Sequence, residues 1–103
     1  MNFKKGQVYK ALRDIPVIYM TSWAAPCSGG RENILPNGEL FEVLSDSTGN
    51  FPSLYAAPLN YEGLQEKFIP EDERKNPLYR GFYLSIRKAI VNADCTLIEG
   101  GKK

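Results

Sequence analysis

The sequence predicts a mainly β fold, built as a small antiparallel barrel or a highly curved sheet of six to seven short strands with one short helix. Seven prolines and nine glycines interrupt a chain of 103 residues, which leaves little room for long helices. Between them lie short runs that are rich in β-branched and aromatic residues, as is typical of strands. The pair Asn37-Gly38 adds a strong turn signal between two such runs.

The first half of the chain predicts four strands, over residues 7–12, 15–21, 33–35 and 39–44. Pro16 has no N–H to donate, so we expect it at the start of its strand or on a sheet edge. Both residues of the Asn37-Gly38 turn tolerate positive φ, which predicts that the third and fourth strands pair as a hairpin. The small residues of segment 22–30 lack periodicity and predict a loop.

The second half predicts the helix and the remaining strands. A strand over residues 53–57 ends at Pro58, and Asn60 is placed to cap a helix with one apolar face. The charged segment 69–77 begins with a candidate helical turn at Pro70. Regular alternation makes residues 80–87 the clearest strand in the chain. Residues 89–93 suit either a helical turn or a bent continuation, and residues 95–98 form the last strand.

Composition indicates one folded domain over residues 1–99, followed by a flexible tail over residues 100–103. The chain is 43% apolar and 24% charged, as in ordinary globular proteins. A formal net charge of +1 provides no long-range field, so nucleic acid is not the expected partner. The N-terminus lacks the apolar stretch of a signal peptide, and no membrane-spanning run is visible. We therefore expect a cytoplasmic protein whose two distant cysteines are free thiols.

The chain contains no histidine, which argues against catalysis. Imidazole is the commonest general base and metal ligand, so a zinc site would have to use two cysteines and carboxylates alone. Cys27 lies in a small-residue loop before Gly29, Gly30 and Arg31. This loop suits a reactive thiolate, an anion-binding site or an ordinary structural loop, and the missing base favours the structural loop. We expect no enzyme activity, no catalytic residue, no cofactor and no metal.

The segment from Ile34 to Leu44, with its Leu-Pro-Asn-Gly turn before Glu-Leu-Phe-Glu-Val-Leu, resembles the central hairpin of bacterial Src-homology-3-type barrels. The resemblance covers about the first half of the chain, and the tryptophan and Gly-Trp-Val strand usual in that family have no counterpart after Leu44. It implies a small module that binds peptides, cell-wall fragments or protein surfaces. A short, near-neutral β protein without catalytic groups is also similar in role to the immunity proteins that neutralise bacterial toxins.

Seven residues are candidates for contact with a protein partner. Three consecutive acids offer charge for steering a basic partner, and a tryptophan, an arginine and two tyrosines offer anchors. The alternatives are a solvated acidic surface, a tryptophan that fills the core under its loop, and tyrosines that cover a sheet edge. The candidates are Glu71, Asp72, Glu73, Tyr79, Tyr83, Trp23 and Arg31.

The function expected from these features is non-enzymatic protein binding. Its most concrete form is an immunity-type inhibitor that blocks the active site of a bacterial toxin. The alternatives are a small nucleic-acid-binding barrel, against which the neutral charge counts, and a peptide- or cell-wall-binding module. An enzyme that uses Cys27 ranks below these.

Overall fold

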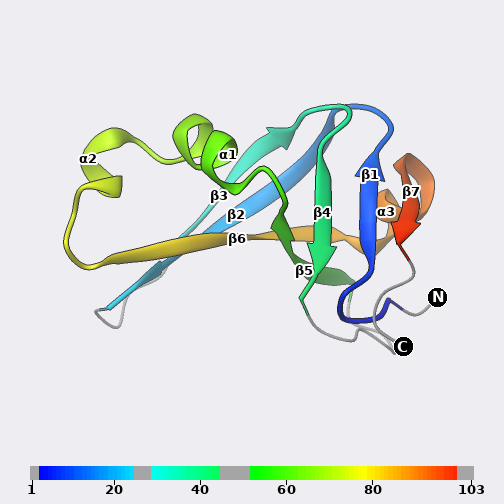
Figure 1. Ribbon diagram of the computed structural model, residues 1–103, viewed down its shortest axis with the longest axis horizontal. Coiled ribbons are helices and arrows are strands. Elements are labelled where there is room, and N and C mark those ends of the chain that lie inside the picture. Colours follow the sequence, from blue (N-terminus) through cyan, green and yellow to red (C-terminus); the bar gives the residue numbers. More distant parts are fainter. Residues whose placement is uncertain (1–2, 25–28, 45–51, 100–103) are drawn as a thin grey trace.

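The computed structural model describes residues 3–24, 29–44 and 52–99 (Figure 1), which form seven strands and three helices. The strands are β1 (Val8–Ala11), β2 (Ile15–Trp23), β3 (Gly29–Leu35), β4 (Leu40–Val43), β5 (Ser53–Pro58), β6 (Tyr79–Arg87) and β7 (Cys95–Glu99). The helices are α1 (Tyr61–Phe68), α2 (Glu71–Arg74) and α3 (Lys88–Asp94). The expected tail over residues 100–103 lies outside the described residues.

All seven strands belong to one antiparallel sheet, in the order β3-β2-β6-β5-β4-β1-β7. In the described part of the chain β3 and β7 each have a single neighbour, so the sheet is open and does not close into a barrel. The prediction of a mainly β fold with six to seven strands is confirmed, although β2 and β6 are longer than expected, with nine residues each. The prediction of a single helix is wrong, because α2 and α3 also form. Both are short, and Val91 is the one buried residue that they contribute.

The two faces of the sheet differ because side chains alternate along each strand. Phe82, Leu84 and Ile86 of β6 are buried, as their spacing predicts. The helix α1 covers this inner face with Leu64 and Phe68. It begins directly after Asn60, as expected, although the Asn60 side chain makes no capping hydrogen bond.

The predicted hairpin between the third and fourth strands is wrong, because β3 pairs with β2 whereas β4 pairs with β1 and β5. The turn itself exists, since the Glu39 N–H donates to the Pro36 carbonyl at 3.2 Å. Gly38 has φ +93°, but no described non-glycine residue has positive φ. The turn is therefore not type I′, the type whose twist suits a two-residue hairpin. The strands on its two sides diverge to different parts of the sheet.

The predicted loop over residues 22–30 is also shorter than expected. Ser22 and Trp23 continue β2, and Gly29 already belongs to β3. Pro16 is the second residue of β2, in agreement with its expected place near a strand start. Pro16 lies opposite Ile34 of β3. The Ile34 N–H donates to the side-chain oxygen of Asn33 at 2.7 Å.

A bulge in β6 depends on Gly81. The register with β2 shifts by one residue there, and Gly81 has φ +128°. Phe82 lies on β6 beyond the last residue that pairs with β5. Its N–H donates instead to the Tyr61 hydroxyl at 3.0 Å. A Cβ on Gly81 would lie 2.6 Å from that hydroxyl oxygen. The missing side chain at residue 81 therefore lets α1 dock close to β6.

We expect Val43→Asp to unfold the protein. Val43 is fully buried in the core, so the substitution would place an unpaired charge there and cost more than about 3 kcal/mol. Glu42→Gln, at the exposed neighbouring position on the same strand, is the matched control and should leave the thermal midpoint near that of the wild type. Circular dichroism during heating measures both, and an unchanged midpoint for Val43→Asp would contradict the strand assignment.

We expect Gly81→Ala to destabilise the protein more than Gly38→Ala. Both glycines have positive φ, which by itself costs alanine about 1–2 kcal/mol. Nothing lies within 4 Å of a Cβ on Gly38, whereas Gly81 faces the Tyr61 hydroxyl. Adding Tyr61→Phe to Gly81→Ala should recover part of the loss, because it removes the clashing oxygen. Urea unfolding of the three variants tests this, and equal losses for the two alanine variants would disprove the steric argument.

Candidate functional site

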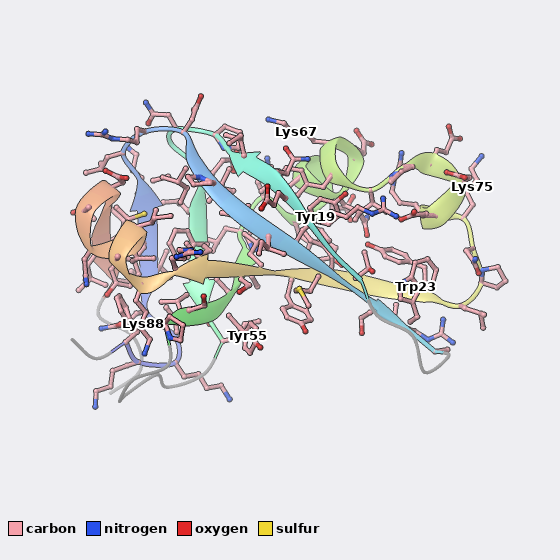
Figure 2. All side chains as sticks on the ribbon, turned by 180° about the vertical axis from the view of Figure 1, so that it is seen from behind. Tyr19, Trp23, Tyr55, Lys67, Lys75 and Lys88 are labelled. Atoms are coloured by element: carbon pink, nitrogen blue, oxygen red, sulfur yellow. The ribbon has the colours of Figure 1, made fainter. Side chains whose placement is uncertain are left out.

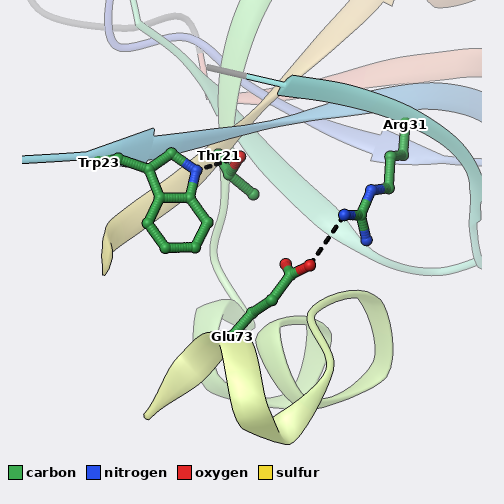
Figure 3. A network of polar contacts seen from close by, with 4 residues as sticks. All are labelled: Thr21, Trp23, Arg31 and Glu73. Atoms are coloured by element: carbon green, nitrogen blue, oxygen red, sulfur yellow. Dashed lines mark hydrogen bonds and ion pairs between the residues drawn. The ribbon is translucent and has the colours of Figure 1, made fainter. Parts of the chain in front are cut away.

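The candidate partner-binding residues fall into two groups in the structure. Trp23, Arg31, Glu73 and Tyr79 lie together where β2, β3 and β6 run towards α2, and we call this group the end cluster (Figure 3). Tyr83 belongs to the sheet face that α1 does not cover. Figure 2 shows the two sides, with Tyr19 towards α1 and Tyr55 on the opposite side.

The aromatic side chains of the end cluster are engaged with their neighbours. The Trp23 ring meets Tyr79 edge-on, with centroids 5.6 Å apart, and its indole N–H donates to the Thr21 hydroxyl at 2.8 Å. The Tyr79 hydroxyl donates to Gln65 Oε1 at 2.8 Å. Burial, and next the charge of Tyr61, raise the pKa of Tyr79 well above its ordinary value. Trp23 is half-buried and keeps part of its surface exposed.

The acidic segment is a helix and not a loop, and two of its three acids are paired. Glu73 Oε2 lies 2.8 Å from the Arg31 guanidinium, which ties α2 to β3. The hydrogen bond to Glu73 is the largest cause of a raised pKa of Arg31. Glu71 pairs with Lys75 at 2.7 Å. Asp72 therefore keeps its charge without an ion-pair partner in the described chain, and the segment offers less free negative charge than three consecutive acids suggest.

The uncovered side of the sheet carries a row of exposed apolar side chains, which we call the outer face. The register places Ile18 beside Ser85, and Ser85 beside Tyr55. In the next row Met20 lies beside Tyr83. The Tyr55 and Tyr83 rings meet edge-on with centroids 5.4 Å apart. Tyr83 is thus a member of a larger apolar surface that the sequence analysis did not assemble.

A groove of 460 Å³ opens on the outer face where β2 and β6 separate. Ladder pairing between these strands begins only at Ile18 and Ser85, because Pro16 has no N–H for further pairing. Beyond that point β6 turns into α3, whose Lys88 N–H donates to the Pro52 carbonyl at 2.9 Å. The groove is lined by Pro16, Val17, Ile18, Glu32, Asn33, Ile34, Pro52, Ser53, Ser85, Arg87 and Ile90.

Sequence reasoning missed this groove although one signal was present. The run from Ile15 to Thr21 is apolar at nearly every position. Its odd-numbered residues face the core, and Ile18 must then point outward because strands alternate. A strand that is apolar on both faces indicates either burial on both sides or an exposed binding surface.

The described residues hold no group of three or more cysteine, aspartate or glutamate side chains placed for a metal ion. None of the helices in the described ranges is long and apolar enough to cross a lipid bilayer. Cys95 is a free thiol, and burial together with the nearby charge of Asp94 raises its pKa to about 11. Cys27, the candidate reactive thiol, lies outside the described residues.

No family model matches the sequence, and comparison with curated proteins and with solved structures finds no match. The described chain forms an open seven-stranded antiparallel sheet, with α1 on its inner face and a groove on its outer face that Ile90 of α3 helps to line. The likeness to Src-homology-3-type barrels and the shared role with immunity proteins stay predictions.

We expect Tyr79→Phe to lower the free energy of unfolding by about 0.5–1.5 kcal/mol, because it removes one hydrogen bond and keeps the ring against Trp23. Tyr83→Phe is the matched control, since in the described chain the Tyr83 hydroxyl has no hydrogen-bond partner. Urea unfolding monitored by Trp23 fluorescence gives both values. Equal stability of the two variants would show that the bond to Gln65 does not hold α1 and β6 together.

Proposed function

We propose that this protein is a non-enzymatic protein-binding domain that uses its outer face. The observation that carries the proposal is the exposure of Ile18 at 40%, Ile34 at 43% and Tyr55 at 39% on one face of the sheet. Scattered exposed apolar residues are ordinary, but a contiguous group on one face of a sheet is typical of interaction sites. The adjacent Tyr83 adds an amphipathic ring of the kind enriched in protein interfaces.

The structure of the end cluster supports a different role for four of the candidate residues. Trp23 packs on Tyr79, Arg31 pairs with Glu73, and the Tyr79 hydroxyl donates to Gln65 of α1. Such contacts fix the position of α2 on the β2–β3 arm. We therefore assign these residues to support of the fold, and we place partner contact at Tyr83 and its neighbours on the outer face.

An immunity-type inhibitor of a bacterial toxin is the more specific form of this proposal. A blocking protein needs a rigid surface, because ordering a loop on binding reduces affinity. The outer face meets that need, since β2 and β6 are central strands that pair on both sides. A nucleic-acid binder receives less support, because Arg87 is the one cation in the groove lining and Glu32 offsets it.

The test compares the two surfaces with one partner, recovered by affinity capture on the wild-type protein. Ile18→Glu and Tyr55→Ser change exposed outer-face residues and should weaken affinity about ten-fold or more, chiefly through faster dissociation. Glu71→Lys and Asp72→Lys on α2 are the comparison variants and should bind like the wild type. Surface-based kinetics measure all four.

The opposite pattern would overturn the proposal. Wild-type binding by Ile18→Glu and Tyr55→Ser, together with slower association of the α2 variants, would move the interface to the acidic helix. Circular dichroism of each variant serves as the folding control, and we expect native spectra because the four side chains are exposed.

A further inference from the structure

The shape of the groove suits an apolar side chain. Ile18, Ile34 and Ile90 of α3 are among the apolar side chains that line the groove. Ser85 lies between the exposed side chains of Ile18 and Tyr55 in the same row, and its small size leaves a depression there. The volume of 460 Å³ lies in the range of sites that take a ligand group of several heavy atoms. An aliphatic side chain with its flanking backbone would fill it.

The charges of the groove are separated and unpaired. Arg87 on β6 and Glu32 on β3 both line it, and β2 lies between their strands. Both side chains are exposed, and neither belongs to an ion pair in the described part of the chain. A guanidinium binds a carboxylate through two parallel hydrogen bonds, so it selects an acid more specifically than a lysine would. The β6 side of the groove therefore favours a carboxylate, and the β3 side repels one.

At Ile34, on the sheet edge next to the groove, the backbone N–H is not free to pair with an added strand. Its N–H already donates to Asn33 Oδ1 at 2.7 Å. An incoming chain cannot use that donor to extend the sheet as an added strand. A segment that lies in the groove beside Ile34 therefore depends more on its side chains, apolar and acidic, than on backbone pairing at that position.

We propose that the groove binds an extended segment of a protein partner in which an aliphatic side chain is followed closely by a carboxylate. The aliphatic side chain lies over Ser85 between Ile18 and Ile90, and the carboxylate pairs with Arg87. Glu32 sets the direction of the segment, because it disfavours the acid at the β3 side. This inference rests on the proposed function, whose binding face it shares.

The test uses synthetic peptides with blocked ends and ¹⁵N-labelled protein. One peptide has the sequence Ser-Gly-Leu-Asp-Gly-Ser, the second has Lys in place of Asp, and the third has Ala in place of Leu. Nuclear magnetic resonance titration should show amide shifts at Ile18, Ser85 and Ile90 with the Leu-Asp peptide. The other two peptides should bind about three- to five-fold more weakly, the size expected for one exposed ion pair or a few apolar contacts.

Charge reversal tests whether Arg87 is the residue that recognises the carboxylate of the peptide. Arg87→Glu should reverse the preference, so that the Leu-Lys peptide binds more tightly than the Leu-Asp peptide. Arg80→Glu is the matched control, because Arg80 is an exposed arginine on the same strand but outside the groove lining, and it should keep the wild-type preference. Equal binding of the two peptides by the wild type, or shifts confined to residues outside the groove, would overturn the inference.

Failure of the inference and failure of the proposed function have different signatures. In one outcome, Ile18→Glu abolishes partner binding, while Arg87→Glu changes neither partner binding nor peptide preference. The outer face then binds a partner, but Arg87 does not pair with a carboxylate of that partner. If the partner binds Ile18→Glu and Arg87→Glu like the wild type, the proposed function fails, and the groove as a partner site fails with it.

Discussion

The aromatic contacts between α1 and the two central strands are the interaction on which the rest of the structure depends. Phe68 stacks on Tyr19 of β2 with centroids 5.2 Å apart and meets Phe82 of β6 at 6.2 Å, while Tyr61 packs on Phe82 at 4.7 Å. These contacts hold α1 on the inner face, where the Tyr61 hydroxyl also satisfies a backbone donor of β6. The position of α2 follows from that of α1, which brings Glu73 within reach of Arg31.

The same packing explains why the outer face remains available. The curved sheet has one inner face, where α1 packs, and Tyr55 lies on the opposite side (Figures 1 and 2). Tyr83 shares that side, since its ring meets the ring of Tyr55. The groove arises at the boundary, where β6 leaves β2 to become α3. A proline without an N–H and a strand that turns into a helix together create a depression on this face.

Each error in the sequence-based predictions has a physical cause. The Asn37-Gly38 pair does form a turn, but the turn type depends on whether Asn37 adopts positive φ, and it does not. Glu73 of α2 looks free in the sequence because its partner Arg31 lies 42 residues away. Tyr83 and Tyr79 are close in the sequence, yet the bulge at Gly81 and the alternation of β6 place their rings in different environments.

The sequence by itself determined where most of the strands lie, though not all of their bounds, which face of α1 is buried, and that imidazole chemistry is absent. These features follow from local periodicity and composition. The tertiary structure alone decided the order of the strands, the pairing of Arg31 with Glu73, and the groove lined by residues from Pro16 to Ile90. The reason is that the alternation of side chains along a strand determines which face of the sheet each side chain occupies, but it does not determine which strand lies next to it. Strand order is a long-range choice made by the packing of the whole core.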